Sequence, residues 1–335
     1  MPGLLGSLAL AAVAVVVIYT GSTYFERAAE RLSRHYGLPV AVHGAIVVAV
    51  GSSFPEISSI VISTVVHGEF SLGVGAIVGS AIFNLLVIPA LSALTSEDLE
   101  ATRDIVHKDA QFYIISVLVL FIVFALGATY VPGGTNSAAI LTRPLVVLPL
   151  ATYGVYVFLH QQDASEHDAV EVRDVDPLRE WGVLAAALVV IALGVEGIVR
   201  SALAFGDIFD TPTFLWGLTV IAAGTSLPDA FVSINAARND DDVTSLTNVL
   251  GSNTFNLLVA IPVGVLLAGT ATINFLVAVP TMGFLAFATL VFVVFTRTNL
   301  ELTNVEAIGF LALYVLFLLW ISLESVGAIE TVQGI

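Results

Sequence analysis

The sequence predicts an all-α integral membrane protein with ten transmembrane helices in two inverted five-helix repeats. Of its 335 residues, 57% are hydrophobic and 11% are charged, which leaves too little polar surface to close a soluble globule. The apolar residues fall into long runs, and two short polar motifs occur once in each half of the chain. The chain has no cysteine, so disulfides and thiolate metal sites play no part in the prediction.

Each predicted span is an apolar segment long enough to cross the hydrocarbon core, which takes about 20 residues as a helix. We interpret the first as a membrane helix and not as a cleaved signal peptide, because no basic region precedes it. The ten spans are 4–25, 38–66, 71–94, 110–131, 138–160, 181–204, 212–237, 244–268, 272–295 and 303–323.

Basic residues predict the orientation of these spans. Cytoplasmic loops carry an excess of Lys and Arg, and nine of the eleven basic residues lie on the side reached after odd-numbered helices. Both termini are therefore expected outside the cell membrane, and a repeat of five helices must be followed by an inverted one. The predicted units are a first repeat (1–160), an acidic cytoplasmic linker (161–180) and a second repeat (181–335). The nine residues are Arg27, Arg31, Arg34, Arg103, Lys108, Arg173, Arg179, Arg238 and Arg297, against Arg143 and Arg200 outside.

Two motifs recur between the halves. The first occupies 51–56 and again 224–229, and the second occupies 79–84 and again 251–256. The first motif ends in a carboxylate in each half, Glu56 and Asp229. A carboxylate at bilayer depth costs roughly 3 kcal/mol or more, so it faces a partner or a watery cavity. Matching positions in inverted repeats predict one shared site near the middle of the membrane.

Helix geometry gathers further oxygens around these carboxylates. Residues three and four apart share a helix face, so two hydroxyls are expected beside each carboxylate, and a hydroxyl beside an amide in the second motif. Pro55 and Pro228 cannot donate to the carbonyl four residues earlier, which predicts kinks that turn backbone carbonyls toward the site. The groups are Ser52 and Ser53 with Glu56, Thr225 and Ser226 with Asp229, Ser80 with Asn84, and Ser252 with Asn256.

All of these donors are hard oxygens. Calcium accepts six to eight such ligands in a tolerant geometry, whereas magnesium demands a strict octahedron and soft metals prefer nitrogen or sulfur. Two carboxylates balance one calcium ion or two sodium ions. The sequence therefore predicts exchange, in which competing cations neutralise the same buried charge in turn.

The paired motifs, Gly-Ser/Thr-Ser-x-Pro-Glu/Asp and Gly-Ser-x-x-Phe-Asn, resemble the repeats of the sodium/calcium exchanger branch of the calcium/cation antiporter superfamily, in a prokaryotic, haloarchaeal form. The resemblance implies ten helices, with the second, third, seventh and eighth around the ions and the first and sixth sliding between outward and inward states. It also implies three sodium ions per calcium, hence electrogenic transport. By the same match, Glu56 and Asp229 are the central calcium ligands, and the carbonyls of Ala49 and Ala222 serve sodium. The flanking sodium and calcium donors are Ser52, Ser53, Ser80, Thr225, Ser226 and Ser252, with Asn84 and Asn256 at the remaining polar positions.

Several alternatives stay open. Asn84 and Asn256 stand where some relatives carry an acid, which argues mildly against potassium dependence, but proton or potassium coupling remains the alternative to sodium. A cation channel and an intramembrane hydrolase are weaker alternatives, and an enzyme is not expected. No cofactor beyond the transported Ca²⁺ and Na⁺ and no nucleic-acid partner is predicted; the partners are these ions and the lipid bilayer, with a monomer plausible. Glu196 and Glu324 lie in or near spans and are expected to have structural or snorkelling roles.

Overall fold

The computed structural model describes residues 3–36, 49–96, 99–103, 105–131, 138–164, 175–297 and 300–325. Within them the chain is almost entirely helical. The α-helices are α1 (Leu4–His35), α3 (Ala49–Ser52), α4 (Phe54–Val61), α5 (Phe70–Leu86), α6 (Ile88–Thr95), α7 (Ala110–Thr129), α8 (Val147–Ala164), α9 (Pro177–Phe209), α10 (Thr213–Trp216), α11 (Ala222–Thr225), α12 (Leu227–Arg238), α13 (Asp242–Phe255), α14 (Ile261–Ala268), α15 (Phe275–Arg297) and α16 (Asn304–Ser325). Four π-helical turns continue some of them, η2 (Ile62–Val66), η3 (Ile105–Asp109), η4 (Gly217–Ile221) and η5 (Asn256–Ala260).

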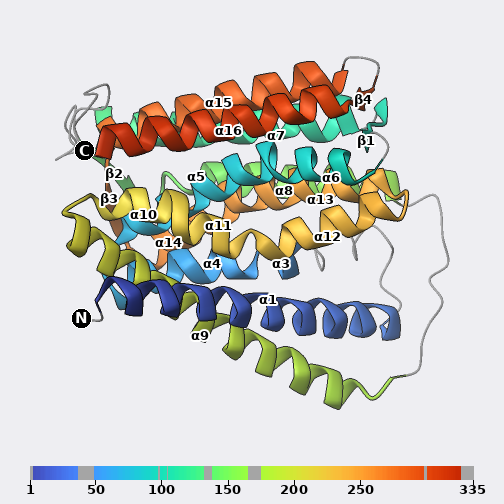
Figure 1. Ribbon diagram of the computed structural model, residues 1–335, viewed down its shortest axis with the longest axis horizontal. Helices are drawn as coiled ribbons and strands as arrows, with labels where there is room; N and C mark the ends of the chain where they lie inside the picture. Colours follow the sequence, from blue (N-terminus) through green and yellow to red (C-terminus); the bar gives the residue numbers. More distant parts are fainter. Residues whose placement is uncertain are drawn as a thin grey trace.

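The helices form three layers (Figure 1). The long helices α1 and α9 lie side by side on one face, and α7, α15 and α16 lie on the opposite face. The interrupted helices between them, α3 to α6 and α10 to α14, carry both motifs. One apolar cluster joins this middle layer to α7, α15 and α16, and a second joins it to α1 and α9 through residues such as Leu72 and Ile221.

Among the described residues, seven helices are long and apolar enough to cross a membrane, or eight if the bent pair Thr213–Thr225 and Leu227–Arg238 is one span. Shorter apolar helices at Phe54–Val66 and Val147–His160 correspond to two further predicted spans. The protein is thus a membrane protein with several spans, while a total of ten remains a prediction. The first part of the predicted span 38–66 lies outside the described residues.

The first helices of the two predicted repeats run antiparallel. Gly21 of α1 lies against Ile191 of α9, and Gly194 of α9 lies against Ile18 of α1. A Cβ atom on Gly21 or Gly194 would lie 2.8 Å from the facing isoleucine side chain, so both positions depend on the close approach that glycine permits. Figure 1 shows that α1 begins and α16 ends at the same end of the molecule, as an even number of crossings requires.

Helices α1 and α9 are both longer than predicted. Spans 4–25 and 181–204 are replaced by helices of 32 and 33 residues, and at 1.5 Å per residue such a helix is close to 50 Å long, well beyond a hydrocarbon core of about 30 Å. The carboxylate of Asp176 caps α9 by accepting from the backbone N–H groups of Leu178 and Arg179 at 3.1 and 3.3 Å. Polar terminal turns therefore continue each helix beyond its apolar part.

The predicted starts of spans 138–160 and 272–295 were wrong. Residues Ala138–Thr142 form strand β2, which pairs antiparallel with strand β3 at Thr270–Asn274, and the helices begin later, at Val147 and Phe275. Buried and exposed side chains alternate along β3, the period of a strand, and the polar and apolar residues of its sequence alternate likewise. A second pair joins β1 (Leu99–Glu100) to β4 (Glu301–Leu302). Each sheet thus joins one strand from each half.

Candidate functional site

Both carboxylate motifs lie where a membrane helix is interrupted. The first break separates α3 from α4 at Ser53, and the second separates α11 from α12 at Ser226, where the axes differ by 44°. The next helix restarts after each serine, because Ile57 N–H donates to Ser53 O at 3.1 Å and Ala230 N–H donates to Ser226 O at 3.0 Å. The interruptions predicted from Pro55 and Pro228 are confirmed.

The structure brings the predicted side chains of the two halves together in the middle layer. Every one of them is inaccessible, with 0% of its surface exposed, even though all ten are polar. Burial of polar groups without compensation costs several kcal/mol each, so their mutual contacts decide what the site can do. The ten are Ser52, Ser53, Glu56, Ser80, Asn84, Thr225, Ser226, Asp229, Ser252 and Asn256.

Two serine pairs join the halves. Ser53 Oγ lies 2.8 Å from Ser252 Oγ, and Ser226 Oγ donates to Ser80 Oγ at 2.8 Å. Ser226 is the repeat counterpart of Ser53, and Ser80 is that of Ser252. The two contacts are therefore equivalent: in each, the first motif of one half meets the second motif of the other half. The pairing shows that each interrupted helix meets the second motif of the opposite half.

Each carboxylate is then held by the second-motif serine of its own half. Ser252 Oγ donates to Asp229 Oδ2 at 2.6 Å, and Ser80 Oγ donates to Glu56 Oε1 at 3.3 Å. Ser52 and Thr225, each from the opposite half, lie beside Asp229 and Glu56 respectively, and the Thr225 hydroxyl donates to the carbonyl of Ile221 at 3.1 Å. Glu56, Ser80 and Ser226 thus form one hydrogen-bonded chain, and Asp229, Ser252 and Ser53 form its counterpart. Each chain contains residues of both halves, and together the two chains are the polar network of the site.

The two asparagines break this symmetry. Asn84 Nδ2 donates to Asp229 Oδ2 at 3.0 Å, across the halves. Its counterpart Asn256 has no hydrogen-bond partner for either amide atom within the part of the chain described by the structure. Asp229 thus accepts one amide hydrogen bond that Glu56 lacks.

One oxygen of each key group remains unused. Within the described ranges, Glu56 Oε2, Asp229 Oδ1, Asn84 Oδ1 and Asn256 Oδ1 are buried without a hydrogen-bond partner. Within the same ranges, no salt bridge pairs Glu56 or Asp229 with a Lys, Arg or His side chain. Two buried carboxylates with free carboxylate and amide oxygens suit a hard cation such as calcium or sodium.

The two predicted backbone ligands lie beside the breaks. Ala49 is the first residue of α3, and Ala222 is the first residue of α11. The carbonyl of Ala222 already accepts Ser226 N–H at 3.1 Å and the Thr225 hydroxyl at 3.4 Å. Sodium coordination by these two carbonyls stays a prediction.

The sequence analysis missed Asn253. Its Nδ2 donates to the carbonyl of Ala81 at 3.0 Å and to the hydroxyl of Tyr113 at 3.4 Å, which ties the second motif of one half to that of the other and to α7. Asn253 stands where the first repeat has Ala81 itself. Comparison of the variable positions inside the repeated motif could have identified it.

Glu196 lies on α9 and bridges to the end of the first interrupted helix. His67 Nε2 lies 2.9 Å from Glu196 Oε2, and Arg200 Nε donates to Glu196 Oε1 at 2.5 Å. Glu324, near the end of α16, is 2% exposed. Neither side chain belongs to the polar network around Glu56 and Asp229.

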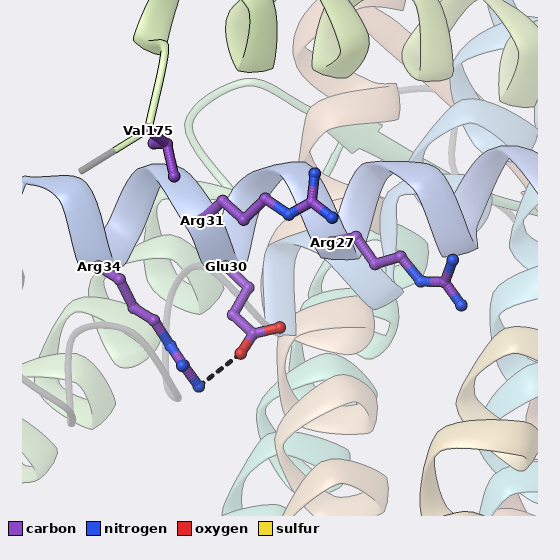
Figure 2. A pocket seen from close by; sticks show the side chains of 5 residues that line it. All are labelled: Arg27, Glu30, Arg31, Arg34 and Val175. Carbon is purple, nitrogen blue, oxygen red and sulfur yellow. Dashed lines mark ion pairs between the residues drawn. The ribbon is translucent and has the colours of Figure 1, made fainter. Parts of the chain in front are cut away.

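A cavity of about 330 Å³ lies elsewhere, at the end of α1. Figure 2 shows its lining, in which Glu30 pairs with Arg34 at 2.6 Å. Three arginines against one glutamate make this cavity unsuited to a cation. The lining residues are Arg27, Glu30, Arg31, Arg34 and Val175.

Comparison with known proteins agrees with this geometry. The chain is 25% identical over 343 residues to the sodium/calcium exchanger MaX1 of Methanosarcina acetivorans, covering 91% of this chain and 95% of that one. It is 28% identical over 314 residues to an uncharacterized membrane protein of Methanocaldococcus jannaschii, covering 90% and 93%. A solved structure of the sodium-calcium exchanger NCX_Mj matches the fold with a TM-score of 0.64 at 24% identity, covering 95% of this chain and 98% of that one.

The family model described as sodium/calcium exchanger protein matches residues 6–160 and 179–323, which is nearly the whole chain. That family consists of transporters and not of enzymes, which excludes the intramembrane hydrolase. The repeated motifs, the interrupted helices and the match over both halves lead to one conclusion: the chain belongs to the sodium/calcium exchanger family.

Proposed function

We propose that the protein is a secondary antiporter that exchanges calcium for sodium across the cell membrane by alternating access. The observation that carries the proposal is the pair of fully buried carboxylates, Glu56 and Asp229, each held in a hydrogen-bonded chain that joins the two halves and each retaining an unused oxygen. A membrane protein of this family has little other reason to bury two acids at the centre of its fold.

The oxygens offered by the network suit both ions. Calcium needs several oxygen ligands at about 2.4 Å, and Glu56, Asp229 and the two asparagine carbonyls supply unused ones. One calcium ion or two sodium ions cancel the charge of both carboxylates. Because calcium and sodium compete for the same two carboxylates, binding of one ion releases the other.

Charge compensation also explains why exchange is coupled. Two uncompensated carboxylates are costly to carry through a low-dielectric passage, whereas a cation-loaded site is close to neutral. The empty protein should therefore reorient slowly and the loaded protein quickly. This difference in the rate of reorientation distinguishes an antiporter from a channel, because a channel conducts ions without reorienting between outward and inward states.

The proposal includes a topology of ten spans in two inverted units, 1–160 and 181–335, joined by a cytoplasmic linker at 161–180 and with both termini outside. The antiparallel course of α1 and α9 supports the inversion. The proposed ligands are the ten buried side chains of the network together with the carbonyls of Ala49 and Ala222. Exchange of three sodium ions for one calcium would move one charge per cycle, worth about 2.3 kcal/mol per 100 mV.

Potassium coupling is the second candidate, because one segment of the chain is 38% identical over 101 residues to the human sodium/potassium/calcium exchanger 4. That segment is 30% of this chain and 16% of the human protein. The neutral side chains of Asn84 and Asn256 favour sodium alone, since the repeated motifs then contain no third carboxylate to balance an additional bound potassium ion.

The test is uptake of radioactive calcium into proteoliposomes with sodium, potassium or proton gradients imposed one at a time. The proposal expects uptake driven by an outward sodium gradient and accelerated by an inside-positive potential, because three sodium ions leaving for one calcium ion entering carry one net positive charge outward. Uptake that follows the calcium gradient alone would show a channel, and uptake driven only by potassium or protons would identify a different counter-ion.

Glu56→Gln serves as the loss-of-function variant in this assay, and Glu30→Gln serves as its control. Glu30 is a glutamate paired with Arg34 at the end of α1, outside the polar network. Sodium-driven uptake should disappear in the first variant and persist in the second. Equal transport by both would contradict the assignment of the site.

A further inference from the structure

A third carboxylate, outside the repeated motifs, lies on a helix that packs against the interrupted helices. Glu26 lies on α1, which packs against α3, α11 and α12, the helices that carry both breaks. Ring contacts fix this packing, with Tyr19 of α1 4.6 Å from Phe231 of α12 and Phe25 of α1 5.9 Å from Phe54 of α4. Ser22, Phe25 and Glu26 are spaced three and four residues apart and therefore share this face.

Two oxygens on this face lack partners. Glu26 Oε1 and Ser22 Oγ are both buried, and within the described ranges neither makes a hydrogen bond. Ser22 is entirely inaccessible, and its hydroxyl lacks the bond to a preceding carbonyl that the hydroxyl of Thr23, next to it, makes to Tyr19 O at 2.9 Å. A serine and a glutamate four residues apart thus present two unused oxygens to the same interior region.

Neighbouring acids are neutralised, but Glu26 is not. Glu30 pairs with Arg34 at 2.6 Å, as Figure 2 shows, and Glu180 of α9 pairs with Arg31 at 3.2 Å. Glu26 forms no salt bridge among the described residues, although Arg27 follows it directly and attracts it weakly. The negative charge of Asp229 opposes that of Glu26.

The repeat gives no packing reason for this acid. The counterparts of Ser22 and Glu26 in the second half are Val195 and Val199, both fully buried apolar residues of α9. The close packing of α1 and α9 on the middle layer therefore does not require a hydroxyl or a carboxylate at these positions. A carboxylate with one buried, unpartnered oxygen and no cationic partner is stabilised by a bound cation.

We propose that Glu26 and Ser22 form a sodium site on α1, beside Asp229 and on one side of the central network. Sodium is assigned because a single carboxylate carries one negative charge, which one monovalent ion balances, and because the two residues supply too few oxygens to replace the ligands of calcium. The proposal rests on the exchange activity proposed above and adds a site outside the repeated motifs.

The test is titration of the purified full-length protein with sodium and, separately, with calcium, using ion-induced thermal stabilisation and calorimetry. Glu26→Gln is expected to raise the half-saturating sodium concentration by about tenfold while changing that of calcium by less than about threefold. Ser22→Ala keeps the charge of Glu26 and should weaken sodium binding by roughly threefold with no change for calcium. Glu30→Gln should match the wild type for both ions.

Two results would overturn the proposal. One is wild-type sodium affinity in Glu26→Gln; the other is an equal loss of affinity for sodium and calcium, which would mean that Glu26 acts only through its charge on the central site. If Glu26→Gln does not fold, Ser22→Ala decides by the same sodium-to-calcium comparison. Failure of the exchange proposal would be seen separately, as calcium binding by the wild type that Glu56→Gln leaves unchanged.

Discussion

Ser53 and Ser252 touch through their hydroxyl oxygens at 2.8 Å, although 199 positions separate them in the chain. The contact recurs at the same distance between Ser226 and Ser80. Four buried hydroxyls thus fasten the interrupted helix of each half to the second motif of the other half, and the two carboxylates are bound to these same serines. Substitutions in the network should therefore affect ion binding more than folding.

The serines that hold the carboxylates provide the first prediction. Ser252→Ala removes the 2.6 Å bond to Asp229, and Ser80→Ala removes the 3.3 Å bond to Glu56. Because the shorter bond to a charged acceptor is the stronger, Ser252→Ala should weaken calcium binding more, by about 1.5–3 kcal/mol against about 1 kcal/mol for Ser80→Ala. Calorimetric titration with calcium measures both, and Ser322→Ala on the exposed face of α16 is the control. A larger effect of Ser80→Ala would contradict the prediction.

The asparagines should separate stability from binding. Asn84→Leu leaves Asp229 without its amide donor and should lower both the melting temperature and the calcium affinity. Asn256→Leu removes an amide that makes no hydrogen bond in the described structure, so its melting temperature without ions should be unchanged or higher. Its calcium affinity should still fall, since a free carbonyl oxygen is lost. Thermal melts with and without calcium test this, and equal destabilisation by both variants would refute the asymmetry.

Close packing of α5 on η4 gives a stability prediction. A Cβ atom on Gly79 would lie 2.8 Å from the Cβ of Ala222 and even closer to the carbonyl oxygen of Leu218, so Gly79→Ala should destabilise the protein by about 1–3 kcal/mol. Gly283→Ala is the matched control, because a Cβ there meets nothing within 4 Å. That variant should be neutral or more stable by up to about 1 kcal/mol, given the better helix propensity of alanine. Melting temperatures in detergent distinguish the two.

The contact between α9 and the end of η2 predicts a kinetic effect. His67 and Glu196 lie 2.9 Å apart and join an outer helix to the interrupted helix that carries Glu56. Glu196→Ala removes this link without touching the network, so it should change the maximal rate of sodium-driven calcium uptake while leaving half-saturating calcium within about twofold. Glu196→Gln keeps a hydrogen-bonding group and should have a smaller effect. A change confined to calcium affinity would show that Glu196 acts on the site instead.

Much of the candidate site could be predicted because its motifs occur once in each repeat. Glu56 and Asp229 share motif positions, and the prolines beside them predict the breaks that the structure shows. The hydrogen-bond partners of the two equivalent asparagines could not be predicted. The repeat gives Asn84 and Asn256 equivalent positions, but in the structure Asn84 donates to Asp229 whereas the Asn256 amide has no partner among the described residues. Such a difference depends on which side chains compete for one acceptor, which the sequence does not show.

Two features of the fold could not be predicted from hydropathy. Hydropathy placed Ala138–Thr142 and residues 272–274 in the helices that follow them, although the backbone there pairs between the halves as strands. It gave no signal for Glu26, because one acid near the arginine-rich end of α1 resembles a solvated residue until packing shows that its oxygen is buried. Both failures arise from contacts between distant segments, which local composition does not encode.

Direct calcium binding by Glu56→Gln and Asp229→Asn tests the central claim, that these two acids jointly hold the transported ion. In calorimetric titrations each variant should lose calcium affinity by at least about 100-fold, or about 2.7 kcal/mol. In ion-free buffer both should melt at or above the wild-type temperature, because a buried uncompensated charge is gone. Folded variants that bind calcium with wild-type affinity would contradict the account.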